Sequence, residues 1–276
     1  MPLVTLAAGI EVYRFASLDA DPRLVHFVST RGGGVSRPPF AGLNLGDGVG
    51  DDPAAVATNR ARLTSALGVA ASRLVTCRQV HGSAVHVVPA VGRSGAADAA
   101  ASAGASSDIP TADALVTAAA GVCLAVLVAD CVPIVLFDPR TPAVGVAHAG
   151  WRGTVAGVAA QTVGAMTAAF GTRPGDLVAG IGPSIGPADY VVGPEVAAAF
   201  RRAFPRDARD VVRDADGDRC RVDLWQANVR QLEAAGVAPD RIAVAGISTA
   251  ASTDRFFSHR AEAGRTGRFA AGAMLR

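Results

Sequence analysis

The most apolar part of the chain lies near its middle, where three short runs of hydrophobic residues follow one another. They are "VCLAVLVAD" (residues 122–130), "VPIVLFDP" (132–139) and "AVGVAHAG" (143–150), and turn-forming residues bound each of them. β-Branched runs of this length are typical of strands that are buried on both faces. The pattern therefore predicts a central sheet built around these three segments.

Helical patterns and further strand patterns flank this centre. Asp52 is a predicted N-cap with Pro53 at the first helical position, and Gly171 is the predicted C-cap of an Ala-rich helix that begins at Thr154. The other predicted elements are strands at residues 24–30, 73–80, 84–88, 176–181 and 241–249, and helices at residues 194–204 and 223–236. The order predicts one α+β domain over residues 1–276, with central mixed β-sheets between helices and a flexible surface insertion at about 90–108.

Composition favours small-molecule chemistry in a reducing compartment. The formal net charge of +2 is too small to predict nucleic acid or a membrane as a partner. Four cysteines, the absence of a targeting pattern and apolar runs shorter than about 20 residues predict a soluble, cytoplasmic protein, which we expect to be a monomer. The chain contains arginine and no lysine, so a bound phosphate must be held by arginine, backbone N–H groups or a metal.

Three polar side chains interrupt or end apolar runs: His81 in "CRQVHG", Cys131 in "VADCVPIV" and His148 in "VAHAG". Two imidazoles and one thiolate are ligands that Zn²⁺ favours, and they leave a fourth position open, as in catalytic zinc sites. Each residue also has a structural interpretation, as a hydrogen-bonded histidine or as a buried cysteine that behaves as a small hydrophobe. Spacing alone leaves both interpretations open.

A series of motifs along the chain resembles one known family. "STRGGGVS", "LNLGDGVGDD", "QVHG", "ADCVPIVLFD", "VAHAGWRG", "GPSIG", "FFSHR" and "GRTGR" occur in this order between residues 29 and 268. They resemble the YfiH-type family, which has been labelled laccase-domain or multicopper polyphenol oxidase and is also described as purine nucleoside phosphorylase. The resemblance implies the YfiH-like fold, related to that of the cytotoxic necrotizing factor cysteine hydrolases. It also implies zinc ligands at His81, Cys131 and His148.

The resemblance further implies chemistry on purine nucleosides. Phosphorolysis would convert adenosine, inosine and methylthioadenosine to free base and ribose 1-phosphate, or to its methylthio form. Deamination of adenosine fits a zinc site, because zinc lowers the pKa of water to about 7. We expect Asp130 to move the proton or to orient a histidine. Arg31 and Arg152 are candidates for binding phosphate, and Asn44 is a candidate for binding the substrate or holding its loop.

Two other uses of the same residues remain open at this stage. Five histidines are too few for a multicopper cluster. A single Cu²⁺ ion, bound by the two imidazoles and the sulfur, is an alternative to Zn²⁺. Alternatively, Cys131 and His148 form the thiolate–imidazolium pair of a cysteine hydrolase that acts on amide bonds, such as those of cell-wall peptides. Asp130 or Asp113 would then orient the histidine.

Overall fold

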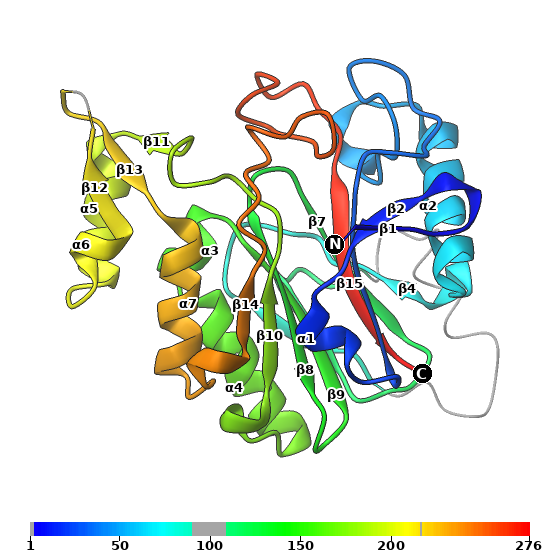
Figure 1. Ribbon diagram of the computed structural model, residues 1–276, viewed down its shortest axis with the longest axis horizontal. Coiled ribbons are helices and arrows are strands. Elements are labelled where there is room, and N and C mark those ends of the chain that lie inside the picture. Colours follow the sequence, from blue (N-terminus) through cyan, green and yellow to red (C-terminus); the bar gives the residue numbers. More distant parts are fainter. Residues whose placement is uncertain (1–2, 90–108, 216) are drawn as a thin grey trace.

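Two six-stranded sheets form the centre of the computed structural model, which describes residues 3–89, 109–215 and 217–276 (Figure 1). The predicted insertion at about 90–108 lies outside these residues. The first sheet has, in spatial order, β1 (Leu3–Thr5), β2 (Glu11–Tyr13), β3 (Leu24–Ser29), β15 (Phe269–Leu275), β7 (Cys123–Val128) and β4 (Leu74–Val75). The second has β14 (Ile242–Val244), β10 (Val178–Ile181), β8 (Val132–Asp138), β9 (Ala143–Ala149), β6 (Ala114–Thr117) and β5 (Val85–Val87).

Helices cover the outer faces of the two large sheets, α2 (Pro53–Leu67) on the first and α4 (Val158–Phe170) on the second (Figure 1). The other helices are α5 (Pro194–Ala203), α7 (Leu224–Ala234) and the short α1 (Ala16–Asp19), α3 (Trp151–Val155) and α6 (Ala208–Val211). Of these, α1 contacts both β3 and β10 and so lies between the two large sheets. A small sheet of β11 (Val191–Val192), β13 (Cys220–Val222) and β12 (Val212–Asp214) lies beside α5 and α6. Short 3₁₀ turns occupy Ala7–Gly9, Asp47–Val49, Ala71–Arg73, Pro174–Asp176 and Pro239–Arg241.

The alternation of side chains along the central strands creates separate apolar layers. In β8, Val135 and Phe137 belong to the core between the two sheets, whereas Ile134 and Leu136 face the layer that contains α4 and α7. On the far side, Leu63 of α2 packs in a third cluster with residues of β3, β7 and β15. The layers are thus α2, the first sheet, the second sheet, and the helices α4 and α7. Both faces of each central strand are buried, which explains why the central segments are continuously apolar.

The predicted α+β class with mixed sheets is confirmed. β4 pairs with β7, β5 with β6, and β14 with β10 in parallel, and the other pairs of the two large sheets are antiparallel. The helix cap predicted at Asp52 is present, since its carboxylate accepts a hydrogen bond from the N–H of Ala54 at 3.0 Å. The register of the β8–β9 hairpin places Pro133 opposite His148, so the start of β8 and the end of β9 share one edge of the second sheet.

Two predicted elements differ in extent from those observed. The helix expected from Thr154 to Phe170 is divided into α3 and α4, because Gly157 adopts a left-handed conformation with φ of 84°. The strand expected at residues 73–80 is reduced to β4, and the chain then turns away from the first sheet toward the second. That turn carries His81 to the site described below.

One central strand, β15, has no counterpart among the predicted elements. Its sequence, "FAAGAML", lacks the β-branched residues that mark the other strands. Close packing accounts for the small side chains, because a Cβ atom on Gly272 would lie 2.6 Å from the ring of Phe27 and 2.6 Å from the carbonyl oxygen of Leu124. The strand is therefore specified by the space between β3 and β7 rather than by intrinsic propensity.

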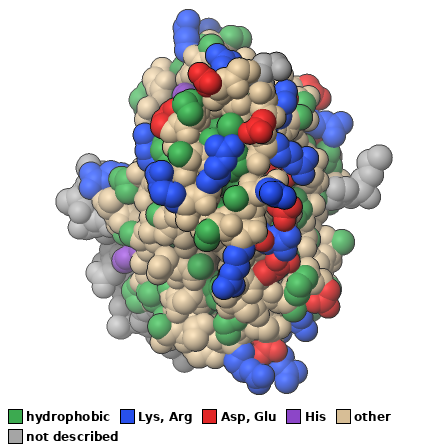
Figure 2. Space-filling view, turned by 90° about the vertical axis from the view of Figure 1, so that its left-hand side faces the viewer, with side chains coloured by type: hydrophobic (Ala, Val, Ile, Leu, Met, Phe, Trp, Pro, Cys, Tyr) green, Lys and Arg blue, Asp and Glu red, His purple; other side chains and the backbone are tan. Residues whose placement is uncertain are grey.

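The face that carries α5, α6 and the small sheet shows arginine and acidic side chains interspersed rather than separated by sign (Figure 2). A nucleic-acid-binding face carries a concentrated basic patch instead, which is absent from the described residues visible in that view. Among the residues that the structure describes, no helix is long and apolar enough to cross a membrane.

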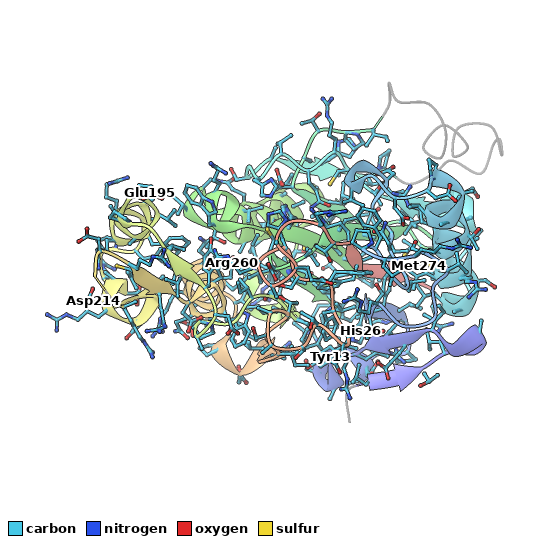
Figure 3. All side chains as sticks on the ribbon, turned by 90° about the horizontal axis from the view of Figure 1, so that it is seen from above. Tyr13, His26, Glu195, Asp214, Arg260 and Met274 are labelled. Atoms are coloured by element: carbon cyan, nitrogen blue, oxygen red, sulfur yellow. The ribbon has the colours of Figure 1, made fainter. Side chains whose placement is uncertain are left out.

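His26 is a buried titratable group in the first sheet, away from the candidate site. Its side chain is 1% exposed, and its Nε2 accepts a hydrogen bond from the N–H of Phe15 at 2.8 Å. Figure 3 shows it near Tyr13. Burial, reinforced by the charge of Arg14, lowers the pKa of His26 to about 3. The folded protein therefore holds this imidazole in its neutral form over most of the acidic range.

We expect His26 to contribute to acid sensitivity. Between pH 6.5 and about 3 the unfolded chain binds a proton that the folded protein does not, so the free energy of unfolding falls as the pH falls. In His26→Gln, whose side-chain oxygen replaces Nε2 as the acceptor, this part of the pH dependence disappears. Urea unfolding at several pH values should show the difference between wild type and variant changing by about 1.4 kcal/mol per pH unit in this window. Parallel pH profiles for the two proteins would contradict the assignment.

Candidate active site

The three predicted ligand residues come together although the first and the last lie 67 positions apart in the sequence. His81 lies in the loop that follows β4, Cys131 directly precedes β8, and His148 is the penultimate residue of β9. The ligand atoms of the three side chains all lie within 4.8 Å of one another. The two imidazole rings meet edge to face with centroids 4.8 Å apart. His148 is buried, Cys131 is partly buried and His81 is exposed, so the group opens toward solvent on one side.

Unusual backbone geometry surrounds the group. His81 and Asp130 have φ values of 60° and 78°, in a left-handed region that non-glycine residues rarely adopt. Such conformations persist only where neighbouring interactions hold them, and they concentrate at functional sites. The left-handed residue Asp130 directly precedes Cys131, so it turns the chain between β7 and β8 at the sulfur.

Glycines allow these segments to approach one another. A Cβ atom on Gly150 would lie 2.9 Å from Sγ of Cys131 and 3.0 Å from Cδ2 of His81. A Cβ atom on Gly153 would lie 2.8 Å from the carbonyl oxygen of Gly82. The sequence "HAGWRG" thus places its two glycines where the start of α3 meets the His81 loop and the sulfur.

Asp113, the residue before β6, lies behind both histidines. Its Oδ1 is 2.9 Å from Nδ1 of His148, and its side chain is fully buried. The same carboxylate accepts hydrogen bonds from three successive backbone N–H groups, those of Val80 at 3.2 Å, His81 at 2.9 Å and Gly82 at 2.7 Å. Burial alone would raise the pKa of Asp113, but the hydrogen bonds from His148 and the Gly82 backbone outweigh burial and lower it.

The sulfur and the buried imidazole shift each other's titration. Burial alone would raise the pKa of Cys131, yet the charge and hydrogen bonding of His148, together with His81, bring it down to about 6. Burial alone would lower the pKa of His148, but the charge of Cys131 and the hydrogen bond with Asp113 raise it to about 9. Cys131 therefore carries negative charge near neutral pH, which suits either a metal ligand or a nucleophile.

The donor set fits a zinc ion. Ligand atoms around one tetrahedral Zn²⁺ lie about 3.5 Å apart, and the three ligand atoms here lie within 4.8 Å of one another, so small side-chain rotations would bring them to that spacing. Within the described part of the chain this is the one group of three or more metal-ligating side chains close enough to share an ion. A blue-copper centre adds an axial methionine, whereas Met166 and Met274 are buried in the two outer apolar clusters.

A cavity of about 760 Å³ opens beside the three ligand residues. Two aromatic side chains, Trp151 and Tyr190, line it. Four arginines also line it, namely Arg78, Arg152, Arg260 and Arg268. The guanidinium group of Arg152 lies 4.5 Å from the ring centroid of Trp151, and that of Arg260 lies 5.3 Å from the ring centroid of Tyr190. Figure 3 labels Arg260 on the loop between β14 and β15.

Asp130 lines this cavity, and its carboxylate accepts three hydrogen bonds from the loop that carries Arg260. Its Oδ1 accepts hydrogen bonds from the hydroxyl groups of Thr249 at 2.6 Å and Ser258 at 2.7 Å, and its Oδ2 accepts one from the N–H of Arg260 at 2.6 Å. The histidine-orienting contact considered for Asp130 is instead made by Asp113. These contacts support a function of Asp130 in positioning Arg260, and proton transfer by Asp130 stays a prediction.

Arg31 and Asn44 do not line the cavity. The guanidinium group of Arg31 donates to the carbonyl oxygen of Thr253 at 2.6 Å and to Glu262 at 3.1 Å, and it lies over the ring of Phe257. These contacts engage Nη1 away from the cavity, so we place the expected phosphate contact on the arginines that line the cavity.

Asn44 holds its loop instead of reaching a substrate. Its side-chain oxygen accepts hydrogen bonds from the N–H groups of Gly46 at 3.0 Å and Arg268 at 2.8 Å, and its amide donates to Asp51 at 2.8 Å. Of the two functions considered for this residue, the structure thus supplies contacts for the second. Through the Arg268 backbone it also fixes one cavity arginine.

Sequence reasoning gave no functional assignment to four residues that line the cavity, namely Tyr190, His259, Arg260 and Arg268. The motifs "FFSHR" and "GRTGR" were the available signal, because they place His259, Arg260 and Arg268 in polar segments of a long loop. Their convergence depends on tertiary structure, since the loop contains no helix or strand that would fix the direction of a side chain.

Comparison with known proteins shows what the chain is similar to. Residues 25–276 match the family described as multi-copper polyphenol oxidoreductase laccase. The protein named purine nucleoside phosphorylase YlmD of Geobacillus stearothermophilus is 40% identical over 244 residues, which cover 88% of this chain and 87% of that protein. The purine nucleoside phosphorylase of Deinococcus radiodurans is 43% identical over 263 residues, covering 95% and 92% of the two chains.

Solved structures extend the likeness to the fold. The crystal structure of YlmD from Geobacillus stearothermophilus matches with a TM-score of 0.88 and 37% identity, and it covers 100% of this chain and 99% of that chain. The crystal structure of the hypothetical protein YfiH of Bacillus licheniformis matches with a TM-score of 0.89 and 30% identity, with the same coverage. The resemblance inferred from the sequence motifs is thereby confirmed.

We expect Gly150→Ala to disrupt the ligand group without unfolding the protein. The added methyl group would push Cys131 and His81 apart, because each lies within about 3 Å of its position. Metal content measured by mass spectrometry after purification in zinc-containing buffer should fall well below one ion per chain. Gly164→Ala is the matched control, since a methyl group there meets open space on α4 and should raise helix stability slightly. Full zinc content in Gly150→Ala would contradict the site geometry.

Proposed function

Because the chain belongs to the multi-copper polyphenol oxidoreductase laccase family, we propose that it is a purine nucleoside phosphorylase, as its relatives in Geobacillus stearothermophilus and Deinococcus radiodurans are named. The proposed substrates are adenosine, inosine and methylthioadenosine, and the products are the free base and ribose 1-phosphate, or its 5-methylthio form. Deamination of adenosine is proposed as a second activity. The observation that carries the proposal is one cavity that joins the His81–Cys131–His148 group to four arginine side chains.

The charge of the cavity supports binding of phosphate. Four guanidinium groups line it, against two carboxylates. Of these, Asp130 accepts three hydrogen bonds and Asp47 forms an ion pair with Arg60 at 3.3 Å, so positive side chains outnumber negative ones in the cavity lining. Guanidinium groups match phosphate oxygens in geometry and in charge, and arginine is the only strongly basic residue type in a chain without lysine.

Arg152 is the best placed of the four for a direct phosphate contact. Its guanidinium group has no hydrogen-bond or carboxylate partner among the described residues, and it lies over Trp151 at the edge of the cavity. By contrast, Arg78 donates to Thr111, Arg260 to the carbonyl oxygen of Val191, and Arg268 to the carbonyl oxygens of Thr266 and Gly267. These three shape the cavity and add to its positive potential.

The aromatic lining supports binding of a purine. Trp151 and Tyr190 each present a ring beside a guanidinium group, and flat aromatic and cationic surfaces stack on heteroaromatic bases. Phosphorolysis requires the phosphate and the anomeric carbon to be held about 3–3.5 Å apart. A single cavity lined by arginines and aromatic rings offers surfaces for both the phosphate and the nucleoside, which supports the proposal.

The ligand group supplies the zinc site of this proposal. His81, Cys131 and His148 would hold Zn²⁺, and the ion when bound supplies a Lewis acid. Asp113 accepts from Nδ1 of His148, so this imidazole keeps its proton on Nδ1 and presents Nε2 to the site. Copper(II) is the alternative ion for the same atoms.

Purified protein incubated with adenosine and phosphate should yield adenine and ribose 1-phosphate, with inosine as the deamination product, as resolved by liquid chromatography.

Arg152→Gln should raise the KM for phosphate about 10–100-fold, because a charge-assisted hydrogen bond is worth about 1.5–3 kcal/mol, while the KM for adenosine changes less. Arg202→Gln, on the exposed surface of α5, is the matched control and should leave both constants unchanged. Adenine release that is independent of phosphate would contradict phosphorolysis.

One observation favours a second candidate function. Cysteine hydrolases use a thiolate, a histidine and a carboxylate that orients the histidine. Here Cys131 has a pKa near 6, His148 has a pKa near 9, and Asp113 lies 2.9 Å from His148. In such an enzyme the thiolate attacks an amide carbonyl and the imidazolium protonates the leaving amine. Zinc ligation and nucleophilic attack are competing uses of one sulfur, so the two candidates exclude each other at any moment.

Chelation and alkylation separate the two candidates. If the protein is a zinc-dependent phosphorylase, treatment with a strong chelator should abolish release of adenine, and added Zn²⁺ should restore it. If it is a cysteine hydrolase, amide cleavage should survive chelation and end when iodoacetamide alkylates Cys131. Cys77, which also lines the cavity, should react far more slowly, because burial and the charge of Asp113 raise its pKa to about 12. Cys77→Ser is therefore the control for alkylation of the wrong sulfur.

A further inference from the structure

We propose that Asp113 is a positioning residue that holds both histidine ligands with a single carboxylate, one through its side chain and the other through its backbone. The inference rests on the zinc site of the proposed function and deepens it. Asp113 does not itself reach the group of ligand atoms, and it does not line the cavity. Its effect is therefore exerted through His81 and His148.

The contact with His148 fixes the tautomer of that ring. An ionised carboxylate only accepts hydrogen bonds, so the 2.9 Å contact between Oδ1 and Nδ1 requires the proton to lie on Nδ1. The lone pair of Nε2 is then free for a ligand. The backbone reinforces the same placement, because the N–H of His148 donates to the carbonyl oxygen of Asp113 at 2.7 Å.

The contact with His81 fixes the backbone of a loop. Oδ1 accepts from the N–H of His81 at 2.9 Å, and Oδ2 accepts from those of Gly82 at 2.7 Å and Val80 at 3.2 Å. Three N–H groups that converge on one carboxylate hold the left-handed conformation of His81, whose φ is 60°. This conformation directs the exposed His81 side chain toward Cys131 although no regular element surrounds it.

One side chain therefore connects two ligands that lie on separate segments. The carboxylate is fully buried and accepts from four N–H groups, three on the loop and one on the ring. The N–H of Asp113 adds a further link, because it donates to the carbonyl oxygen of Ala84 just beyond the loop. A change at Asp113 should consequently disturb both histidines together.

Asp113→Asn is a sharp test because the amide has only one acceptor. If its oxygen stays toward His148 and His81, its NH₂ group faces the N–H groups of Val80 and Gly82, so donors oppose donors. If the amide is flipped, its NH₂ group faces Nδ1 of His148, and the ring must move its proton to Nε2. The first orientation displaces the His81 loop, and the second removes the lone pair that the metal requires.

The experiment measures zinc affinity by competition with a chromophoric chelator, together with the visible spectrum of the Co²⁺-loaded protein. Asp113→Asn should bind zinc about 10–100-fold more weakly than wild type, and its Co²⁺ ligand-field bands should shift. Asp138→Asn is the matched control: Asp138 is also fully buried and accepts from two backbone N–H groups, but at the opposite end of β8. An equal loss in both variants, or wild-type affinity and spectrum in Asp113→Asn, would overturn the proposal.

If Asp113→Asn does not fold, as judged by circular dichroism, the wild-type protein still provides the test. Nitrogen-15 correlation spectra of the zinc-loaded protein should show the His148 ring protonated at Nδ1, and a ring protonated at Nε2 would overturn the proposal. Failure of this inference is distinguishable from failure of the proposed function. Wild-type protein that binds zinc and releases adenine in the presence of phosphate retains the function whatever the result for Asp113.

Discussion

A buried carboxylate surrounded by N–H groups determines the geometry of this site. Charge in a protein interior is costly unless it is hydrogen-bonded, and Asp113 accepts from three successive backbone N–H groups and from the ring of His148. These contacts attach an irregular loop to the edge of the second sheet. The exposed imidazole of His81 thereby becomes as well placed as His148, which lies within β9.

Around this carboxylate, small residues and unusual backbone conformations allow close approach of the segments. Gly150 leaves space for the sulfur and for the His81 ring, and Gly153 leaves space for the carbonyl oxygen of Gly82. The left-handed residue Asp130 fastens the loop of Arg260 to the chain just before Cys131. Asp130 therefore connects the ligand group to the arginine-lined wall of the cavity. A displacement of Cys131 should consequently also shift Arg260.

Much of the fold could be predicted from the sequence because apolar periodicity and helix caps are local signals. They gave the strands at the centre of the second sheet, the cap at Asp52 and the helices at residues 194–204 and 223–236. The three candidate ligand residues could also be nominated, because polar side chains that interrupt or end apolar runs are unusual, and the structure brings them together. Contacts between distant segments could not be predicted. Strand β15 has small side chains because its neighbours leave little space, and Arg31 forms an ion pair with Glu262, which lies 231 positions away. Asp113 could be named as one of two carboxylates able to orient a histidine, but its hydrogen bonds to the N–H groups of the His81 loop depend on tertiary structure.

The family description and the names of the relatives point to different chemistries, and the positions of the histidines distinguish between them. A cluster of several copper ions needs many imidazole ligands that lie together. Here His26 accepts a hydrogen bond inside the first sheet, His86 lies on the exposed strand β5, and His259 lies in the loop after β14. Only two of the five histidines belong to the ligand group. Two imidazoles and one thiolate have the capacity to hold one ion, and the cavity beside them presents the cationic and aromatic surfaces that a purine nucleoside and phosphate would require. The donor set thus favours Lewis-acid chemistry at a single ion over multicopper oxidation. The arginines of the cavity would bind the anionic phosphate that takes part in that chemistry.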